Sequence, residues 1–167
     1  MKLTDLLERL YDTGWAAVLR ENALAFPWVE CLHVLAITTV VGSISVVDLR
    51  LLGVAWRDRP VRRVLHDVLP ITWIAFGLSV VSGFLLFASN APTYARNPFL
   101  QIKLALIGVA GVNMSIFHLW ARRSLPEWEA APSLPFRAKV AGAVSLVSWI
   151  AVVAAARWIG FTILSPA

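Results

Sequence analysis

Residues 68–95 read VLPITWIAFGLSVVSGFLLFASNAPTYA and contain no Asp, Glu, Lys or Arg. The core of a lipid bilayer is about 30 Å thick, so a helix needs roughly 20 apolar residues to cross it. Because this stretch exceeds that length without a single charge, it predicts a membrane-spanning helix.

Similar stretches lie on both sides of it. Residues 31–47, 104–121 and 140–156 also contain no Asp, Glu, Lys or Arg, and the first and last continue past a single charge. We therefore expect spans near residues 28–48, 68–88, 100–120 and 140–160. Short connections place consecutive helices side by side, so the expected fold is all-α, an integral membrane antiparallel four-helix bundle over residues 27–167.

The composition agrees with a membrane protein and excludes several other classes. The 167 residues are 59% hydrophobic and 15% charged, whereas soluble domains have roughly 45–50% and about 25%. A single cysteine excludes an internal disulfide framework and a multi-cysteine metal site. No P-loop and no Gly-x-Ser-x-Gly motif is present, and we do not expect the chain to be an enzyme on its own. The expected partner is the lipid bilayer, and we do not expect the protein to bind nucleic acid.

Basic residues predict the orientation of the spans. The two loops that follow the first and third spans hold nine Arg and Lys residues, whereas five lie on the other side. The positive-inside rule places these two loops in the cytoplasm. The expected location is a bacterial inner membrane, with both termini in the periplasm.

Residues 1–26 have a different pattern. Leu3, Leu6, Leu7 and Leu10 recur at helical spacing between charged residues, which predicts an amphipathic helix over residues 3–20 lying in the outer interface. The connection 89–98 is rich in Asn, Pro and Thr and predicts a short external turn.

Ionisable residues within membrane spans are costly and often functional. Glu30 precedes His33 by three residues, so both lie on one helix face and the carboxylate could orient an imidazole that binds a metal. The alternative is a neutral His33 that is hydrogen-bonded within the bundle. A di-iron bundle needs a second Glu-x-x-His motif and further glutamates, and we find no second copy. We expect Lys103 to reach the outer headgroups.

Two other histidines are expected near the inner ends of their spans. Gly111 and Ser115 share a face with His118 and leave room for a flat macrocycle, although an interfacial histidine is the alternative. His66 begins the second span, where an exposed or capping histidine is the alternative. Asp48 and Arg50 end the first span, and we expect them to have a structural role.

Depth predicts which histidines could share a cofactor. His33 and His118 differ by roughly 18 Å along the bilayer normal at 1.5 Å per residue, which excludes one shared metal centre. His66 and His118 lie at similar depth and could provide bis-histidine ligation of one haem b. Nearby Arg62, Arg63 and Arg122 could then pair with the haem propionates.

Two motifs resemble those of a known family. The run from His33 through Gly42 and Ser43 to Asp48-Leu-Arg-Leu-Leu-Gly53 and the pattern Asn113-x-x-x-x-His118 resemble small bacterial four-helix inner-membrane proteins of unassigned function. That family looks distantly like copper-resistance D (CopD)-like proteins and membrane cytochromes b. The cytochrome likeness implies that His33, His66 and His118 are the only histidines available to haem iron. A two-haem cytochrome b needs four histidines, so at most one bis-histidine haem is expected.

Three functions follow as hypotheses. The first is a haem-b-binding electron-transfer subunit that passes electrons between a quinone pool and a partner. The second is a cofactor-free accessory or assembly subunit of a larger membrane complex, favoured by the small soluble portion. The third is a metal or proton transporter that uses Glu30 and His33, although no broken helices or inverted repeat support it.

Overall fold

The structure is entirely helical over the part of the chain that it describes. The computed structural model describes residues 2–130 and 134–164, with side chains to residue 120 and again over 134–162. The helices are α1 (Leu3–Tyr11), α2 (Gly14–Glu21), α3 (Ala25–Leu52), α4 (Val61–Ser89), α5 (Ala91–Arg96), α6 (Pro98–Ala130) and α7 (Phe136–Leu164). The predicted all-α class is therefore confirmed.

Four of these helices are long and apolar enough to cross a membrane. They are α3, α4, the 98–120 part of α6, and α7. Each contains the span predicted for it, and α3, α4 and α7 extend beyond theirs by several residues. The end of α3 has a local cause, because Gly53 adopts φ 72° and its N–H bonds to the Arg50 carbonyl, which is how glycine commonly ends a helix. Pro60 then caps the start of α4.

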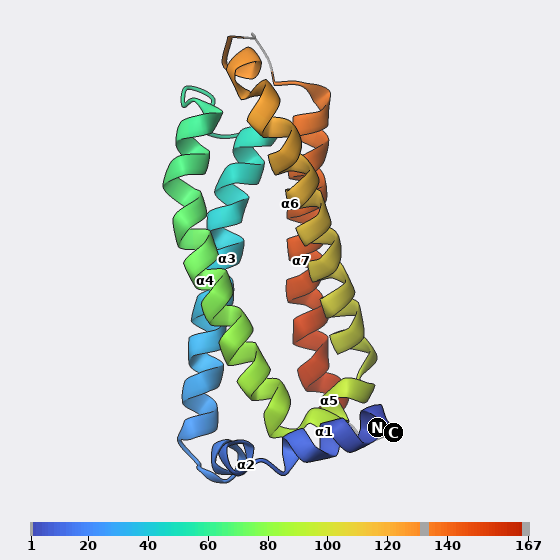
Figure 1. Ribbon diagram of the computed structural model, residues 1–167. Helices are drawn as coiled ribbons and strands as arrows, with labels where there is room; N and C mark the ends of the chain where they lie inside the picture. Colours follow the sequence, from blue (N-terminus) through green and yellow to red (C-terminus); the bar gives the residue numbers. More distant parts are fainter. Residues whose placement is uncertain (1, 131–133, 165–167) are drawn as a thin grey trace.

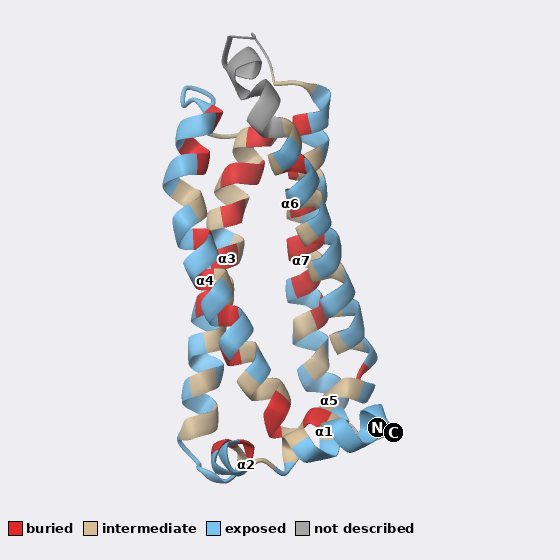
Figure 2. Cartoon of the chain, viewed as in Figure 1, coloured by how far each residue is buried: buried red, intermediate tan, exposed pale blue. Residues whose placement is uncertain are grey.

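The long helices associate as two pairs (Figure 1). α3 packs along α4, α6 packs along α7, and contacts between α3 and α7 join the pairs, whereas α4 and α6 make few contacts. Buried residues lie on the facing sides of the helices and exposed ones lie outside (Figure 2). Many exposed side chains are large and apolar, such as Trp28, Ile74 and Leu119. An outer surface of this kind suits contact with lipid.

Small residues set the closest approach between the pairs. A Cβ placed on Gly142 of α7 would lie 3.0 Å from the Asp48 carbonyl oxygen and 3.0 Å from Leu51 Cβ, both on α3. Close backbone contact at small residues is the usual way helices associate in lipid. A polar contact also joins α3 to α4, because the hydroxyl oxygens of Ser43 and Thr72 lie 2.8 Å apart.

The N-terminal segment differs from the prediction. The single helix expected over residues 3–20 is two helices, α1 and α2, because Thr13 has extended backbone and occupies the N-cap position of α2. Thr13 also donates its hydroxyl to the Leu10 carbonyl at 2.7 Å. Such local side-chain bonds compete with helix continuation. The predicted turn at 89–98 contains the short helix α5, which has proline in its first turn.

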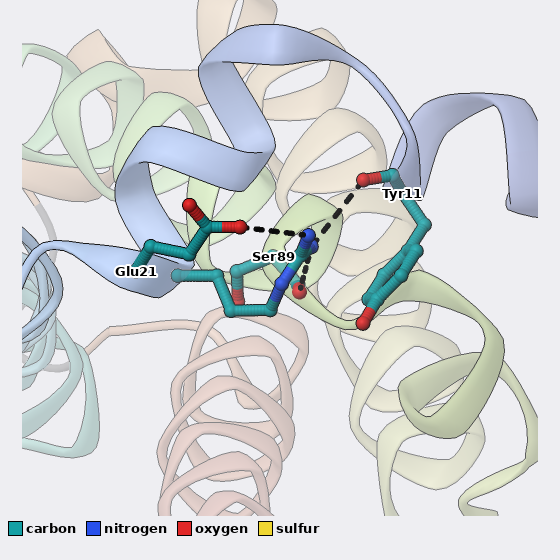
Figure 3. Close-up of polar contacts among 4 residues, drawn as sticks. Tyr11, Glu21 and Ser89 are labelled. Carbon is teal, nitrogen blue, oxygen red and sulfur yellow. Dashed lines mark hydrogen bonds and ion pairs between the residues drawn. The ribbon is translucent and has the colours of Figure 1, made fainter.

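Arg20 ties this segment to the end of α4. Its guanidinium donates to the carbonyl oxygens of Tyr11 at 3.3 Å and Ser89 at 3.4 Å. It also lies 4.0 Å from a Glu21 carboxylate oxygen and 4.0 Å from the centroid of the Tyr11 ring. The dashed lines in Figure 3 mark the polar contacts of this group with the three labelled residues. α1 and α2 therefore lie across one end of the bundle (Figure 1).

The contact at Gly142 yields a stability prediction. We expect Gly142→Ala to lower the unfolding free energy by about 1–3 kcal/mol, the usual cost of overpacking, because the obstructing Asp48 atom is backbone. The matched control is Gly77→Ala on α4, where an added Cβ meets nothing within 4 Å. Thermal unfolding in detergent checks both variants, and an equal unfolding temperature for the two would contradict the close-contact argument.

Candidate functional site

A cavity of about 520 Å³ lies between the two helix pairs. All four long helices line it, with residues 40–51 of α3, 65–76 of α4, 107–119 of α6 and 141–149 of α7. These segments belong to the half of the bundle nearest the 53–60 loop. Most of the lining is apolar and includes four aromatic side chains, Trp73, Phe76, Phe117 and Trp149. Cavities of this size and character commonly hold small molecules.

Two features of the sequence leave this space open. Gly108 and Gly111 of α6 line the cavity, and a Cβ on either would meet nothing within 4 Å. In addition, the backbones of α4 and α6 come close at few points, although Phe117 of α6 shares a core cluster with Val64 and Leu65 of α4. The prediction of open space on the helix face of His118 agrees with this geometry.

His118 lies in the cavity wall with a defined ring orientation. Its side chain is half-buried, and Nδ1 lies 2.9 Å from the Met114 carbonyl oxygen. A carbonyl can only accept, so Nδ1 carries the proton and donates it. In the neutral ring Nε2 is then unprotonated and can accept a hydrogen bond or bind a metal ion. Metal-binding histidines commonly have their other nitrogen held in this way.

Among the Asp, Glu, Lys and Arg residues whose side chains the structure describes, Asp48 is the most deeply buried. It is 2% exposed and lines the same cavity from α3. The Ser145 side chain of α7 lies close enough to interact with its carboxyl group, and within the described residues Oδ2 has no hydrogen-bond partner. A buried polar atom without a partner costs about 1–3 kcal/mol. Asp48 is therefore a buried carboxyl group in the wall of an apolar cavity, and one of its oxygens has no partner among the described residues.

Sequence reasoning assigned Asp48 a structural role and missed its place in the site. The Arg50 side chain does not neutralise the Asp48 carboxyl group. Its Nε donates instead to the Arg59 carbonyl at 2.8 Å. The helical spacing of the sequence did indicate that Asp48 is buried. Ile44 and Leu51 lie four residues before and three residues after Asp48, on its helix face, and both are buried.

Asn113 is the polar residue of the second family-like motif. Its side-chain amide donates to the Ala141 carbonyl at 2.9 Å, which joins α6 to α7. Asn113 also lines the cavity. Its bond to the neighbouring helix indicates that it positions the α6 face that carries His118.

The structure does not bring His66 into this cavity. The His66 side chain is exposed, and its Nδ1 lies 3.3 Å from Asp67 Oδ1. With Arg62 and Arg63 it lines a separate, open hollow of about 350 Å³. The predicted pairing of His66 with His118 thus has no shared cavity. Arg122, the third predicted propionate partner, lies where the structure describes no side chains.

His33 lies nearer the opposite end of the bundle, outside the cavity lining. Its Nδ1 is 3.0 Å from the Ser82 hydroxyl, and its ring packs on Gly83, where an added Cβ would lie 2.9 Å from the His33 Cε1. This geometry agrees with the alternative of a histidine bonded within the bundle. Glu30 is exposed.

The pKa of Tyr94 on α5 is raised from its usual value. Burial is the larger cause, and the Glu30 carboxylate adds to it by repelling a phenolate charge. The Tyr94 phenol therefore stays protonated at neutral pH, as a hydrogen-bonding group at this end of the bundle. It takes no part in the cavity.

Comparison with known proteins identifies the family. A model of a family of unknown function, DUF6644, matches residues 23–162 and so covers all four long helices. The chain belongs to this family. No curated protein and no solved structure matches the chain. The resemblance to copper-resistance D-like proteins and cytochromes b therefore stays a prediction.

The unpartnered oxygen predicts an unusual effect on stability. We expect Asp48→Leu to raise the unfolding free energy of the ligand-free protein by about 1–3 kcal/mol, because it removes a buried polar atom that lacks a partner. The matched control is Asp67→Leu, an exposed acid on α4, for which we expect little change. A clearly lower unfolding temperature for Asp48→Leu would show that its contact with Ser145 matters more than the unpaired oxygen.

Proposed function

We propose that this protein is an electron-transfer subunit of a bacterial inner membrane that binds a redox-active ring molecule within the bilayer. In this proposal α3, α4, α6 and α7 cross the membrane as an antiparallel bundle. The 53–60 loop lies in the cytoplasm, and α1 and α2 lie at the outer surface. The cavity between the helix pairs is the observation that carries the proposal.

The character of the cavity supports this class of ligand. Its volume is about 520 Å³ and its walls are mostly apolar, with Asp48 of α3 and His118 of α6 among the lining residues. Small-molecule sites commonly combine apolar walls with a few polar groups that orient the ligand. The weak contact between α4 and α6 also leaves a side of the cavity through which a molecule dissolved in lipid could enter.

Haem b is the first candidate occupant, and the residues present fit a single histidine ligand. His118 Nε2 would bind the iron, and the Met114 carbonyl would hold the imidazole in the required orientation. The apolar walls would exclude water, and Gly108 and Gly111 leave space beside the ring. The haem, when bound, supplies one-electron exchange. His66 lies outside the cavity and would not be the second ligand.

A quinone or its hydroquinone is the second candidate occupant. Asp48 favours it, because Oδ2 is a buried polar atom without a partner among the described residues. Haem iron would leave that oxygen unsatisfied, whereas a ring that carries a hydroxyl group would satisfy it. Both candidates fit an electron-transfer subunit that works with a quinone pool and a protein partner.

Visible absorption spectra test the haem form of the proposal. We expect purified wild-type protein from haem-supplied cells to show a reduced b-type spectrum if His118 holds haem. His118→Ala should then lose the haem, because no other histidine lines the cavity within the described residues. His66→Ala is the matched control and should keep it, because His66 is exposed on α4.

Equal haem content in the two variants would overturn the assignment of His118. A colourless wild-type protein from which solvent also extracts no quinone would contradict the electron-transfer proposal as a whole. The accessory-subunit hypothesis would then be favoured, together with the transporter hypothesis based on Glu30 and His33.

A further inference from the structure

We infer that the cavity is a hydroquinone site in which Asp48 and His118 each accept a hydrogen bond from one hydroxyl group of the ring. This inference rests on the proposed function, since it names the ligand of the same cavity. It goes further than the proposed function, because it assigns the redox form of the ligand and the residues that recognise it.

Asp48 provides the first acceptor. Its carboxyl group is buried in the cavity wall and interacts with the Ser145 side chain of α7. One of its oxygens, Oδ2, has no hydrogen-bond partner in the described residues. Buried polar atoms in native proteins are nearly always hydrogen-bonded, so an exception needs an explanation. A ligand hydroxyl that points toward α3 would provide the missing bond.

His118 provides the second acceptor, on α6. Because Nδ1 donates to the Met114 carbonyl, the neutral ring has no proton on Nε2. In this neutral form Nε2 can accept a hydrogen bond but cannot donate one. It selects a ligand with an O–H group over a ligand with a carbonyl oxygen at the same place.

With the Asp48 carboxyl group accepting at Oδ2, the two acceptors on different helices require a ligand with two donors. A para-hydroquinone is flat and apolar over its faces and carries one hydroxyl group at each end of the ring. Its oxidised form carries two carbonyl oxygens instead, and one of these would meet the lone pair of His118 Nε2. The site should therefore prefer the reduced form. The aromatic side chains of Trp73 and Phe117 in the wall suit a flat ring.

The route of entry suits a molecule of the bilayer. The helices α4 and α6 contribute to the cavity wall, but their backbones come close to each other at few points. An apolar tail attached to the ring could extend between them toward the exposed side chains of Ile116 and Leu119. This arrangement favours a hydroquinone with a hydrocarbon tail over a small polar phenol.

Calorimetric titration of the full chain in detergent tests the inference. The probes are a benzohydroquinone with a decyl tail, kept reduced under anaerobic conditions, and the matching oxidised quinone. We expect the reduced probe to bind about tenfold or more tightly than the oxidised probe, the effect of one strong hydrogen bond. Asp48→Leu and His118→Phe should each weaken binding of the reduced probe by about tenfold or more.

The controls remove similar groups outside the cavity. Asp67→Leu and His66→Phe alter an exposed acid and an exposed histidine of α4, and neither should change the affinity. Asp48→Asn keeps the size of the side chain and serves if the leucine variant does not fold. We expect it to weaken binding less than Asp48→Leu, because its amide oxygen can still accept a hydrogen bond.

The outcomes separate this inference from the proposed function. Equal affinity for both probes, or unchanged affinity in Asp48→Leu and His118→Phe, would overturn the inference. A wild-type protein that holds haem on His118 and binds neither probe would also overturn it, while the electron-transfer proposal would stand. A protein that holds no haem and binds neither probe would contradict both.

Discussion

The close contact of α7 with α3 at Gly142 is the constraint on which the arrangement depends. Lipid offers apolar side chains no reason to prefer one another, so helices associate where small residues let backbones meet. Gly142 allows α7 to approach the Asp48 backbone and the Leu51 side chain of α3, at distances that leave no space for a larger residue. This contact joins the two pairs along one side, whereas α4 and α6 stay nearly apart on the other.

The same arrangement explains why a cavity forms and why Asp48 lies in it. The α3–α7 contact carries Asp48 into the interior beside Ser145. The glycines of α6 leave open space across from it. If close packing were the only requirement, an apolar side chain would be expected at the position of Asp48. A carboxyl group with one unsatisfied oxygen is expected where stability is given up for ligand binding.

Much of the fold could be predicted from the sequence, because long uncharged stretches have few alternatives to a membrane helix. The four long apolar helices and the all-α class followed from that constraint. The break at Thr13 did not, since it depends on a local hydroxyl contact within a favourable helical pattern. The site was predicted in part. The space beside His118 followed from the spacing of small residues, but the pairing with His66 rested on depth alone. Depth does not show which way a side chain points, and His66 points outside the cavity.

The central claim is that the cavity holds a redox-active ring molecule. The most direct measurement is mass spectrometry of the small molecules that copurify in mild detergent with wild-type protein and with Gly111→Phe. This variant fills the cavity from α6, and Gly77→Phe on the exposed face of α4 is its control. We predict haem or a quinone with the wild type and with Gly77→Phe, and neither with Gly111→Phe. Phospholipid alone in all three samples, or the same ring molecule in all three, would contradict the claim.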